Sequence, residues 1–99
     1  MISNQILQTT IDGLKAISRV ELCVVDTEGK TVVTTTGQMN NITKAAREFA
    51  SGPADSQEIQ GYQFFKIHDE LQLGYILVVA GTSEDAHTVG KIAAFQIQT

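Results

Sequence analysis

The chain of 99 residues is 42% hydrophobic and 18% charged, the composition of a folded globular protein rather than of a disordered segment. Its formal net charge of −4 and its scattered basic residues exclude the clustered Lys and Arg that phosphate neutralisation requires, so we expect no direct contact with nucleic acid. No apolar stretch approaches the ~20 residues of a membrane span and no signal pattern opens the chain, so we expect one cytoplasmic domain, residues 1–99, without a membrane partner.

A helix and a hairpin are predicted for the first third of the chain. Apolar residues recur at three- and four-residue spacing and predict a helix over about residues 3–18. Two segments rich in β-branched residues, 20–26 and 31–36, predict two strands. The turn between them begins with Asp26 and places Gly29 at its left-handed position, which is the chemistry of a short hairpin.

The middle helix has the most regular pattern in the chain. Its apolar residues follow the i, i+3, i+4, i+7, i+8 spacing without a break: Ile42, Ala45, Ala46, Phe49 and Ala50. We expect Ile42, Ala46 and Phe49 to pack on a sheet. Asn40 or Asn41 can cap the start of the helix. At its end we expect a left-handed Gly52, followed by Pro53, which cannot continue the helix.

The last part of the chain predicts further strands and a terminal helix. A short strand around residues 58–60 is followed by strands 62–68 and 71–80, which form a hairpin across His68-Asp69-Glu70. Thr82 or Ser83 can cap the last helix, residues 83–99. The predicted fold is α+β, with a central antiparallel sheet of about five strands flanked by terminal helices and the middle helix.

Two segments resemble a known family. Residues 20–30 read VELCVVDTEGK, and residues 61–81 end in LGYILVVAG. Together they resemble the N-terminal sensory domain, the sugar diacid recognition domain, of sugar-diacid-type bacterial transcriptional regulators. The resemblance covers nearly the whole chain and implies a PAS-like sheet, with GAF domains as a related architecture. It also implies recognition of a small carboxylic acid and control of a C-terminal helix-turn-helix that this sequence does not contain.

The sequence offers little for catalysis or metal binding. It lacks a nucleophile elbow, a phosphate loop and a Ser-His constellation. His68 and His87 have no second ligand of suitable type at i+3 or i+4, so we interpret both as solvated. The single cysteine, Cys23, excludes an internal disulfide and lies mid-strand between aliphatic residues, as a core thiol does. We therefore expect no enzyme, no cofactor and no metal site.

A carboxylate ligand needs cationic side chains or free backbone donors, and the start of the middle helix offers both. Its first turn contains no acid, whereas the last helix begins with Glu84 and Asp85. The predicted ligand-binding residues come from this helix start and from the strand after residue 61: Asn41, Thr43, Arg47, Tyr62, Phe64 and Lys66. The structural alternative is a capped surface helix whose bases are simply solvated.

Alternation in strand 62–68 divides its side chains between two faces. Tyr62, Phe64, Lys66 and His68 share one face, and Gln63, Phe65 and Ile67 share the other. Lys66 between aromatic residues fits a ligand clamp, and it fits equally well a lysine that protects an edge strand from aggregation. The sequence does not say which face meets the middle helix, and Tyr75 on the next strand shares this ambiguity.

The terminal helices predict a dimer interface, because their apolar stripes are wider than one sheet face usually covers. The residues that we assign to this interface are Leu7, Leu14, Val89 and Ile92. The alternative is that both helices only cover the open face of one sheet.

Two classes of function fit these patterns. The first is the sensory domain described above, which binds a small acid and signals through its terminal helices. The second is a ligand-free dimerisation module of the roadblock type, which has the same order of elements and pairs through its sheet edge and middle helix. A sensor should enclose a polar-lined cavity between middle helix and sheet, and a scaffold should be packed solid there.

Overall fold

The computed structural model describes residues 1–37, 39 and 41–99, and within them it contains three helices and one antiparallel sheet. The sheet has five strands in the order β2-β1-β5-β4-β3. The elements along the chain are α1 (Asn4–Ser18), β1 (Leu22–Asp26), β2 (Thr31–Thr34), α2 (Thr43–Ser51), β3 (Ser56–Ile59), β4 (Tyr62–Asp69), β5 (Gln72–Ala80) and α3 (Glu84–Gln98). The predicted α+β layout, with terminal helices and a middle helix, is confirmed.

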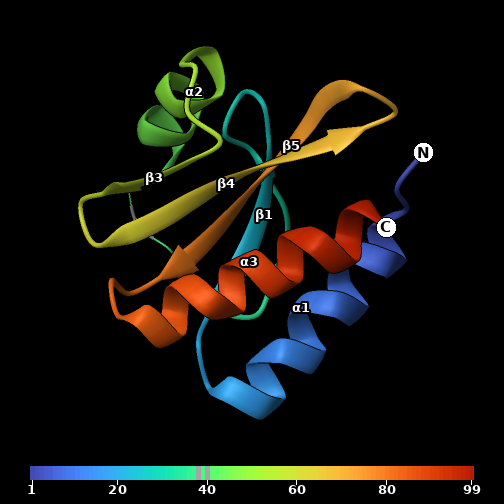
Figure 1. Ribbon diagram of the computed structural model, residues 1–99, viewed down its shortest axis with the longest axis vertical. Coiled ribbons are helices and arrows are strands. Elements are labelled where there is room, and N and C mark those ends of the chain that lie inside the picture. The colour runs from blue at the N-terminus through green and yellow to red at the C-terminus, as the bar shows by residue number, and fades with distance from the viewer. Residues whose placement is uncertain (38, 40) are drawn as a thin grey trace.

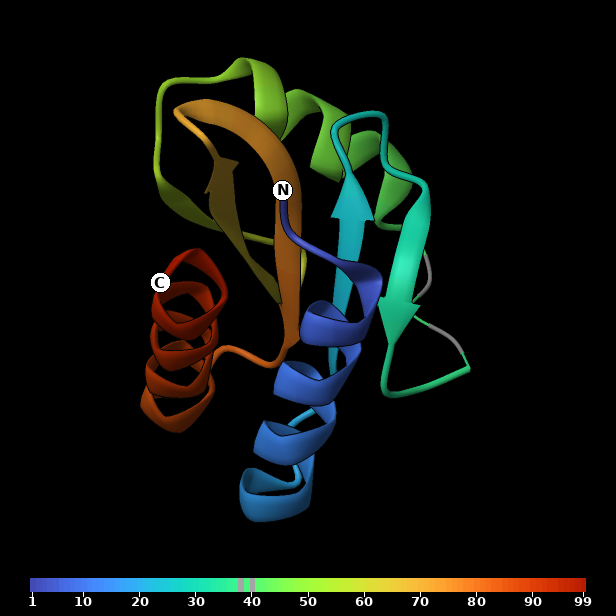
Figure 2. The same ribbon diagram turned by 90° about the vertical axis from the view of Figure 1, so that its right-hand side faces the viewer.

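The helices lie on opposite faces of the sheet. Figures 1 and 2 show α1 and α3 side by side on one face, with α2 on the other. The terminal helices thus cover one face of the sheet. The sequence analysis named this arrangement as the alternative to a dimer interface formed by these helices. The strands between these two helix layers are buried on both faces, and β1 is accordingly almost continuously apolar.

Alternation along the strands divides the interior into two cores. The core under α1 and α3 contains Phe65, Ile67, Leu77 and Val79, together with Leu7 and Ile11 of α1. The core under α2 contains Phe64, Ile76 and Val78. The predicted alternation is therefore confirmed from Tyr62 to Ile67, and it is the Tyr62 face that meets α2. Tyr75 packs on the opposite core, away from α2.

The first hairpin forms as predicted and also supports α2. The Asp26 carboxylate accepts hydrogen bonds from the backbone N–H groups of Glu28 and Lys30, both at 2.9 Å, and Gly29 has a φ of 88°. A Cβ atom on Gly29 would lie 2.6 Å from the carbonyl oxygen of Thr43. Thr43 in turn donates its hydroxyl hydrogen to the Gly29 carbonyl at 3.3 Å. The hairpin tip is therefore in direct contact with the first residue of α2.

Both strands of this hairpin are shorter than predicted. β1 begins at Leu22 rather than at residue 20, and β2 ends at Thr34 rather than at residue 36. The reason is side-chain competition, because the Thr35 hydroxyl accepts the Leu22 N–H at 2.9 Å. Thr35 also donates to Glu21, and hydrogen bonds from Lys15 and then from Thr35 lower the pKa of the Glu21 carboxyl.

The ends of α2 differ from the prediction. Its N-cap is Ile42, which makes no side-chain capping bond, and Asn41 has a φ of 61°; Asn40 lies outside the described residues. Gly52 is extended, with a φ of −86° and a ψ of 170°, rather than left-handed. Pro53 explains this, because proline sterically disfavours the helical region for the residue before it. The start of α3 is as predicted, since the Ser83 hydroxyl accepts the Ala86 N–H at 3.1 Å.

The last two hairpins have tight turns that shift the predicted boundaries. Glu70 and Leu71 both have positive φ values, 55° and 74°, so the turn lies at these two residues and β4 continues to Asp69. Gln60 and Gly61, with φ values of 52° and 87°, turn the chain from β3 into β4. β3 therefore spans Ser56–Ile59 instead of residues 58–60. Positive φ at both central residues is the geometry of a two-residue hairpin.

Cys23 lies in the core under α2 and is 1% exposed. Burial disfavours the thiolate and raises the pKa of this thiol to about 12. The thiol is therefore protonated at neutral pH, in agreement with the predicted role as an inert core residue.

Candidate functional site

A depression of about 860 Å³ lies at the start of α2. Its lining comes from α2 and from the turn after β3: Asn41, Thr43, Lys44, Ala45, Arg47, Glu48, Ile59 and Gln60. Half of the predicted ligand-binding set, Asn41, Thr43 and Arg47, is in this lining. As predicted, the first turn of α2 contains no acidic residue.

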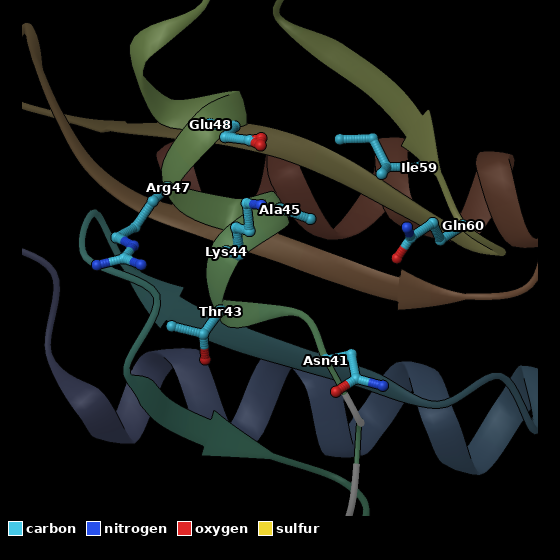
Figure 3. A pocket seen from close by; sticks show the side chains of 8 residues that line it. All are labelled: Asn41, Thr43, Lys44, Ala45, Arg47, Glu48, Ile59 and Gln60. Carbon is cyan, nitrogen blue, oxygen red and sulfur yellow. The ribbon is translucent and has the colours of Figure 1, made fainter.

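The polar side chains of this depression do not converge on one point. Figure 3 shows Thr43 and Arg47 on one side of α2, with Ile59 and Gln60 on the other. The Thr43 hydroxyl is already bonded to the Gly29 carbonyl. The Glu48 carboxylate also lines the depression and would repel an anion. The depression is therefore a surface around the helix rather than a clamp for a small acid.

The remaining predicted ligand residues lie elsewhere. Phe64 is fully buried and packs on Phe49, with 5.9 Å between the ring centroids, and Tyr62 packs on the same core. The Lys66 ammonium donates to the carbonyl oxygen of Gly52, at the C-terminal end of α2. It also lies 5.4 Å from the centre of the Phe49 ring. Lys66 thus stabilises the end of α2, where a cation is favoured, instead of reaching a ligand at its start.

Strand geometry explains this separation. The step from Tyr62 to Lys66 covers about 13 Å of β4, because each strand residue advances about 3.3 Å. β4 passes under α2, so the two residues lie beneath different parts of the helix. β4 is also not an edge strand, since β3 pairs with it, so the alternative role of Lys66 as an edge protector does not apply either.

The interface between α2 and the sheet is apolar and well filled. Its buried side chains are all at most 4% exposed: Cys23, Val25, Ile42, Ala46, Phe49, Phe64, Ile76 and Val78. Across the described part of the chain, no buried side-chain nitrogen or oxygen lacks a hydrogen-bond partner. We expect such packing in a scaffold module and polar-lined space at this interface in a sensor.

β3 forms a regular edge of the sheet. Its residues pair one to one with β4, from Ser56 with Phe65 to Ile59 with Tyr62. Lys66 N–H donates to the Asp55 carbonyl, and backbone direction alternates along a strand. The N–H and C=O groups of Asp55, Gln57 and Ile59 therefore face β4, and those of Ser56 and Glu58 face outward. Ser56, Gln57 and Glu58 are exposed.

The opposite edge, β2, is irregular. Val24 pairs with Val33 but Val25 pairs with Thr31, so Val32 is an extra residue that forms a bulge. The Gln8 side chain of α1 donates to the Thr34 carbonyl at 3.2 Å, which occupies an outward group of this edge. Bulges and covered groups protect an edge from pairing, and β3 carries neither within the described residues.

The predicted dimer residues of the terminal helices are only partly at the surface. Leu7 is fully buried and Val89 is 8% exposed, because both belong to the core between the helices and the sheet. The assignment of Leu7 to an interface is therefore corrected, since its side chain has no free surface. Leu14 is partly buried against the same core, and Ile92 is 43% exposed.

The outward groups of β3 were missed at the sequence level, although a signal for them exists. Gln60-Gly61 between Ile59 and Tyr62 fits a two-residue hairpin turn, and such a turn defines which residues of β3 bond to β4. With Ile59 and Tyr62 as the bonded pair, Ser56 and Glu58 follow as the outward residues.

No protein-family model matches the chain, and no curated protein matches it either. The resemblance to sugar-diacid sensory domains therefore stays a prediction. Among the residues that the structure describes, no helix is long and apolar enough to cross a membrane. The same residues contain no group of three His, Cys, Asp or Glu side chains placed to hold a metal ion.

Proposed function

We propose that the chain is an interaction module that forms a homodimer through the edge of β3 and the neighbouring surface of α2. The observation that carries this proposal is the regular, exposed edge of β3, in contrast to the bulged and partly covered edge of β2. The solid packing between α2 and the sheet supports the same function, because it leaves α2 as a rigid flank of that edge. This is the scaffold role of roadblock-type modules.

Edge pairing around a twofold axis has a natural register. In an antiparallel pair, outward residues bond to outward residues, so Ser56 and Glu58 of one copy must face the same pair in the second copy. An axis through Gln57 places Ser56 opposite Glu58 twice and uses every outward group of the strand. An axis through Glu58 would place two glutamates directly opposite each other, which is destabilising.

The exposed side of α2 is complementary to a second copy of itself. Lys44 and Glu48 lie one turn apart on the surface of α2, with Ala45 beside them. Two such helices in antiparallel orientation pair Lys44 of one with Glu48 of the other, twice. The small Ala45 side chain permits a close approach of the two helices.

The test is the molar mass in solution and its dependence on one outward backbone group. By size-exclusion chromatography with light scattering we expect a mass of about twice 10.7 kDa for the unchanged chain. Ser56→Pro removes an outward N–H without removing a bond to β4, and proline is tolerated at the first residue of a strand, so we expect a folded monomer. Ser56→Ala keeps the N–H and should remain a dimer.

A monomeric unchanged chain at every concentration from about 1 μM to about 1 mM would refute the dimer. A dimer that survives in Ser56→Pro would move the interface away from β3.

A second candidate is the sensory domain for a small carboxylic acid in a transcriptional regulator. The observation that favours it is the depression at the acid-free start of α2, with Lys44 and Arg47 in its lining. The test is a thermal-shift screen of small mono- and dicarboxylates, because a ligand at 100 times its dissociation constant adds about 2.7 kcal/mol of stability. Arg47→Ala should weaken any acid found by about 1.5 to 3 kcal/mol, whereas Lys66→Ala should leave its affinity unchanged. A screen without a binder would exclude this function.

A further inference from the structure

A groove of mixed charge runs along the α3 side of β3. Two depressions of about 270 and about 400 Å³ share Ser56, Phe65 and His87 in their linings, so they adjoin between β3 and α3, and we call the pair the groove. Glu58 lies at one end of the groove, and the charged residues at the other end are two bases, Lys66 and Lys91, and one acid, Asp55.

The α3 side of this groove is held in place by contacts of His87 with two residues of β4, Gln63 and Phe65. Gln63 donates its amide N–H to the Gly81 carbonyl at 2.9 Å, so its amide oxygen accepts from Nδ1 of His87 at 2.8 Å. The His87 ring also lies 5.5 Å from the Phe65 ring. Gly90 allows this packing, because a Cβ atom there would lie 2.3 Å from the Phe65 ring. These contacts bring α3 close to β4, and Lys91 lies one turn after His87 on the same helix.

Two of the charges that face this groove, on Glu58 and Lys91, are not neutralised by an ion pair within the described part of their own chain. Glu58 and Lys91 form no ion pair with any other described residue, and both are exposed. Glu58 pairs with Gln63 and Ser56 with Phe65, so the side chains of Ser56 and Glu58 both point to the α3 face of the sheet.

We infer that Glu58 of one copy binds Lys91 of the other across the twofold axis of the dimer, and that this contact, made twice, selects the register of the β3 edges. The inference rests on the proposed dimer. With the axis through Gln57, Glu58 lies directly opposite Ser56 of the second copy, and directly opposite side chains share one face. In each copy Ser56 lines the groove together with His87 and Lys91. The Glu58 carboxylate therefore enters the basic end of the second copy's groove.

Charge complementarity of this kind determines which partner and which register are accepted more than it determines total affinity. A register shifted to place the axis at Ser56 would put Glu58 beside Ala54 of the second copy and lose the contact with Lys91. The shift in the other direction would bring the two Glu58 side chains together. Only the axis at Gln57 satisfies both charges, so the groove favours a second copy of this chain over an unrelated strand.

Charge reversal at the two positions tests this contact, with the dimer dissociation constant measured by analytical ultracentrifugation. Glu58→Lys and Lys91→Glu should each weaken the homodimer about tenfold or more, because each creates a pair of like charges twice. An equimolar mixture of the two variants should dimerise within about threefold of the unchanged chain, because both contacts become attractive in the mixed dimer. Glu28→Lys, a charge reversal in the β1–β2 turn, is the control and should leave the constant unchanged.

The outcomes separate this inference from the proposed function. If the unchanged chain is a monomer, both the proposed homodimer and the contact between Glu58 and Lys91 are refuted. If it is a dimer and the reversals leave the dissociation constant unchanged, the edge pairing stands and the contact between Glu58 and Lys91 is refuted. The contact would also be refuted if each variant alone dimerised more weakly and the equimolar mixture dimerised no better. Such a result would show that the two charges act within one copy. Circular dichroism should show all variants folded, since both side chains are exposed.

Discussion

Replacing Phe49 by alanine is expected to lower the free energy of unfolding by about 3 to 5 kcal/mol. Phe49 is 2% exposed and fills the centre of the layer between α2 and the sheet, against Phe64 and beneath the Lys66 ammonium. Its removal leaves a cavity that the surrounding strands cannot close, because they are buried on both faces. Equilibrium denaturation in urea, at one fixed protein concentration, measures the change.

Phe95→Ala is the matched control for this measurement. The Phe95 side chain is 72% exposed on α3, so its loss should change the free energy of unfolding by no more than about 0.5 kcal/mol. A loss below about 1 kcal/mol for Phe49→Ala would show that α2 does not pack on the sheet through this residue.

Replacing Gly29 by alanine is expected to lower the free energy of unfolding by about 2 to 4 kcal/mol. Two penalties add at this position. The φ of 88° is unfavourable for a residue with a Cβ atom, and that atom would lie 2.6 Å from the Thr43 carbonyl oxygen. Because the obstacle is backbone rather than a flexible side chain, the start of α2 must move. Thermal and urea denaturation both report this change.

Gly13→Ala provides the comparison for Gly29→Ala. Gly13 lies within α1, and a Cβ atom there has no neighbour within 4 Å. Alanine should therefore stabilise the chain by about 0.5 to 1 kcal/mol, as expected for an exposed helix interior. If Gly29→Ala and Gly13→Ala changed the free energy of unfolding by similar amounts, the contact between the hairpin tip and α2 would make no contribution to stability.

Local patterns were sufficient to predict the elements and their order. The periodicity of α2 identified Ile42, Ala46 and Phe49 as its buried residues, and all three are at most 4% exposed. The turn at Gly29 was also predicted correctly, and the cap of the last helix, predicted as Thr82 or Ser83, is Ser83; both features depend on contacts within a few residues. Such features follow from backbone geometry and side-chain chemistry that a single sequence carries.

The candidate site was harder to predict, because it depends on how distant segments cross. Arg47 and Lys66 are both basic and both near the apolar face of α2, yet Lys66 contacts the C-terminal end of α2 and Arg47, in the middle of the helix, lines the depression beside its start. The distance between Arg47 and Lys66 depends on where β4 passes under α2, which a single sequence does not show. The burial of Leu7 has the same origin, since a wide apolar stripe does not show which of its residues the sheet covers.

The bulge at Val32 limits how far the sheet can grow. A chain with two regular edges could add neighbours at both ends and assemble into an open filament by repeated head-to-tail contacts. In this fold the β2 edge is not available for pairing with another strand, because β2 contains an extra residue and the Gln8 side chain occupies the Thr34 carbonyl. In the proposed dimer, contact through the remaining edge is self-complementary and closes on itself. On that proposal, assembly by edge pairing stops at a ten-stranded sheet of two copies, the sum of five strands from each.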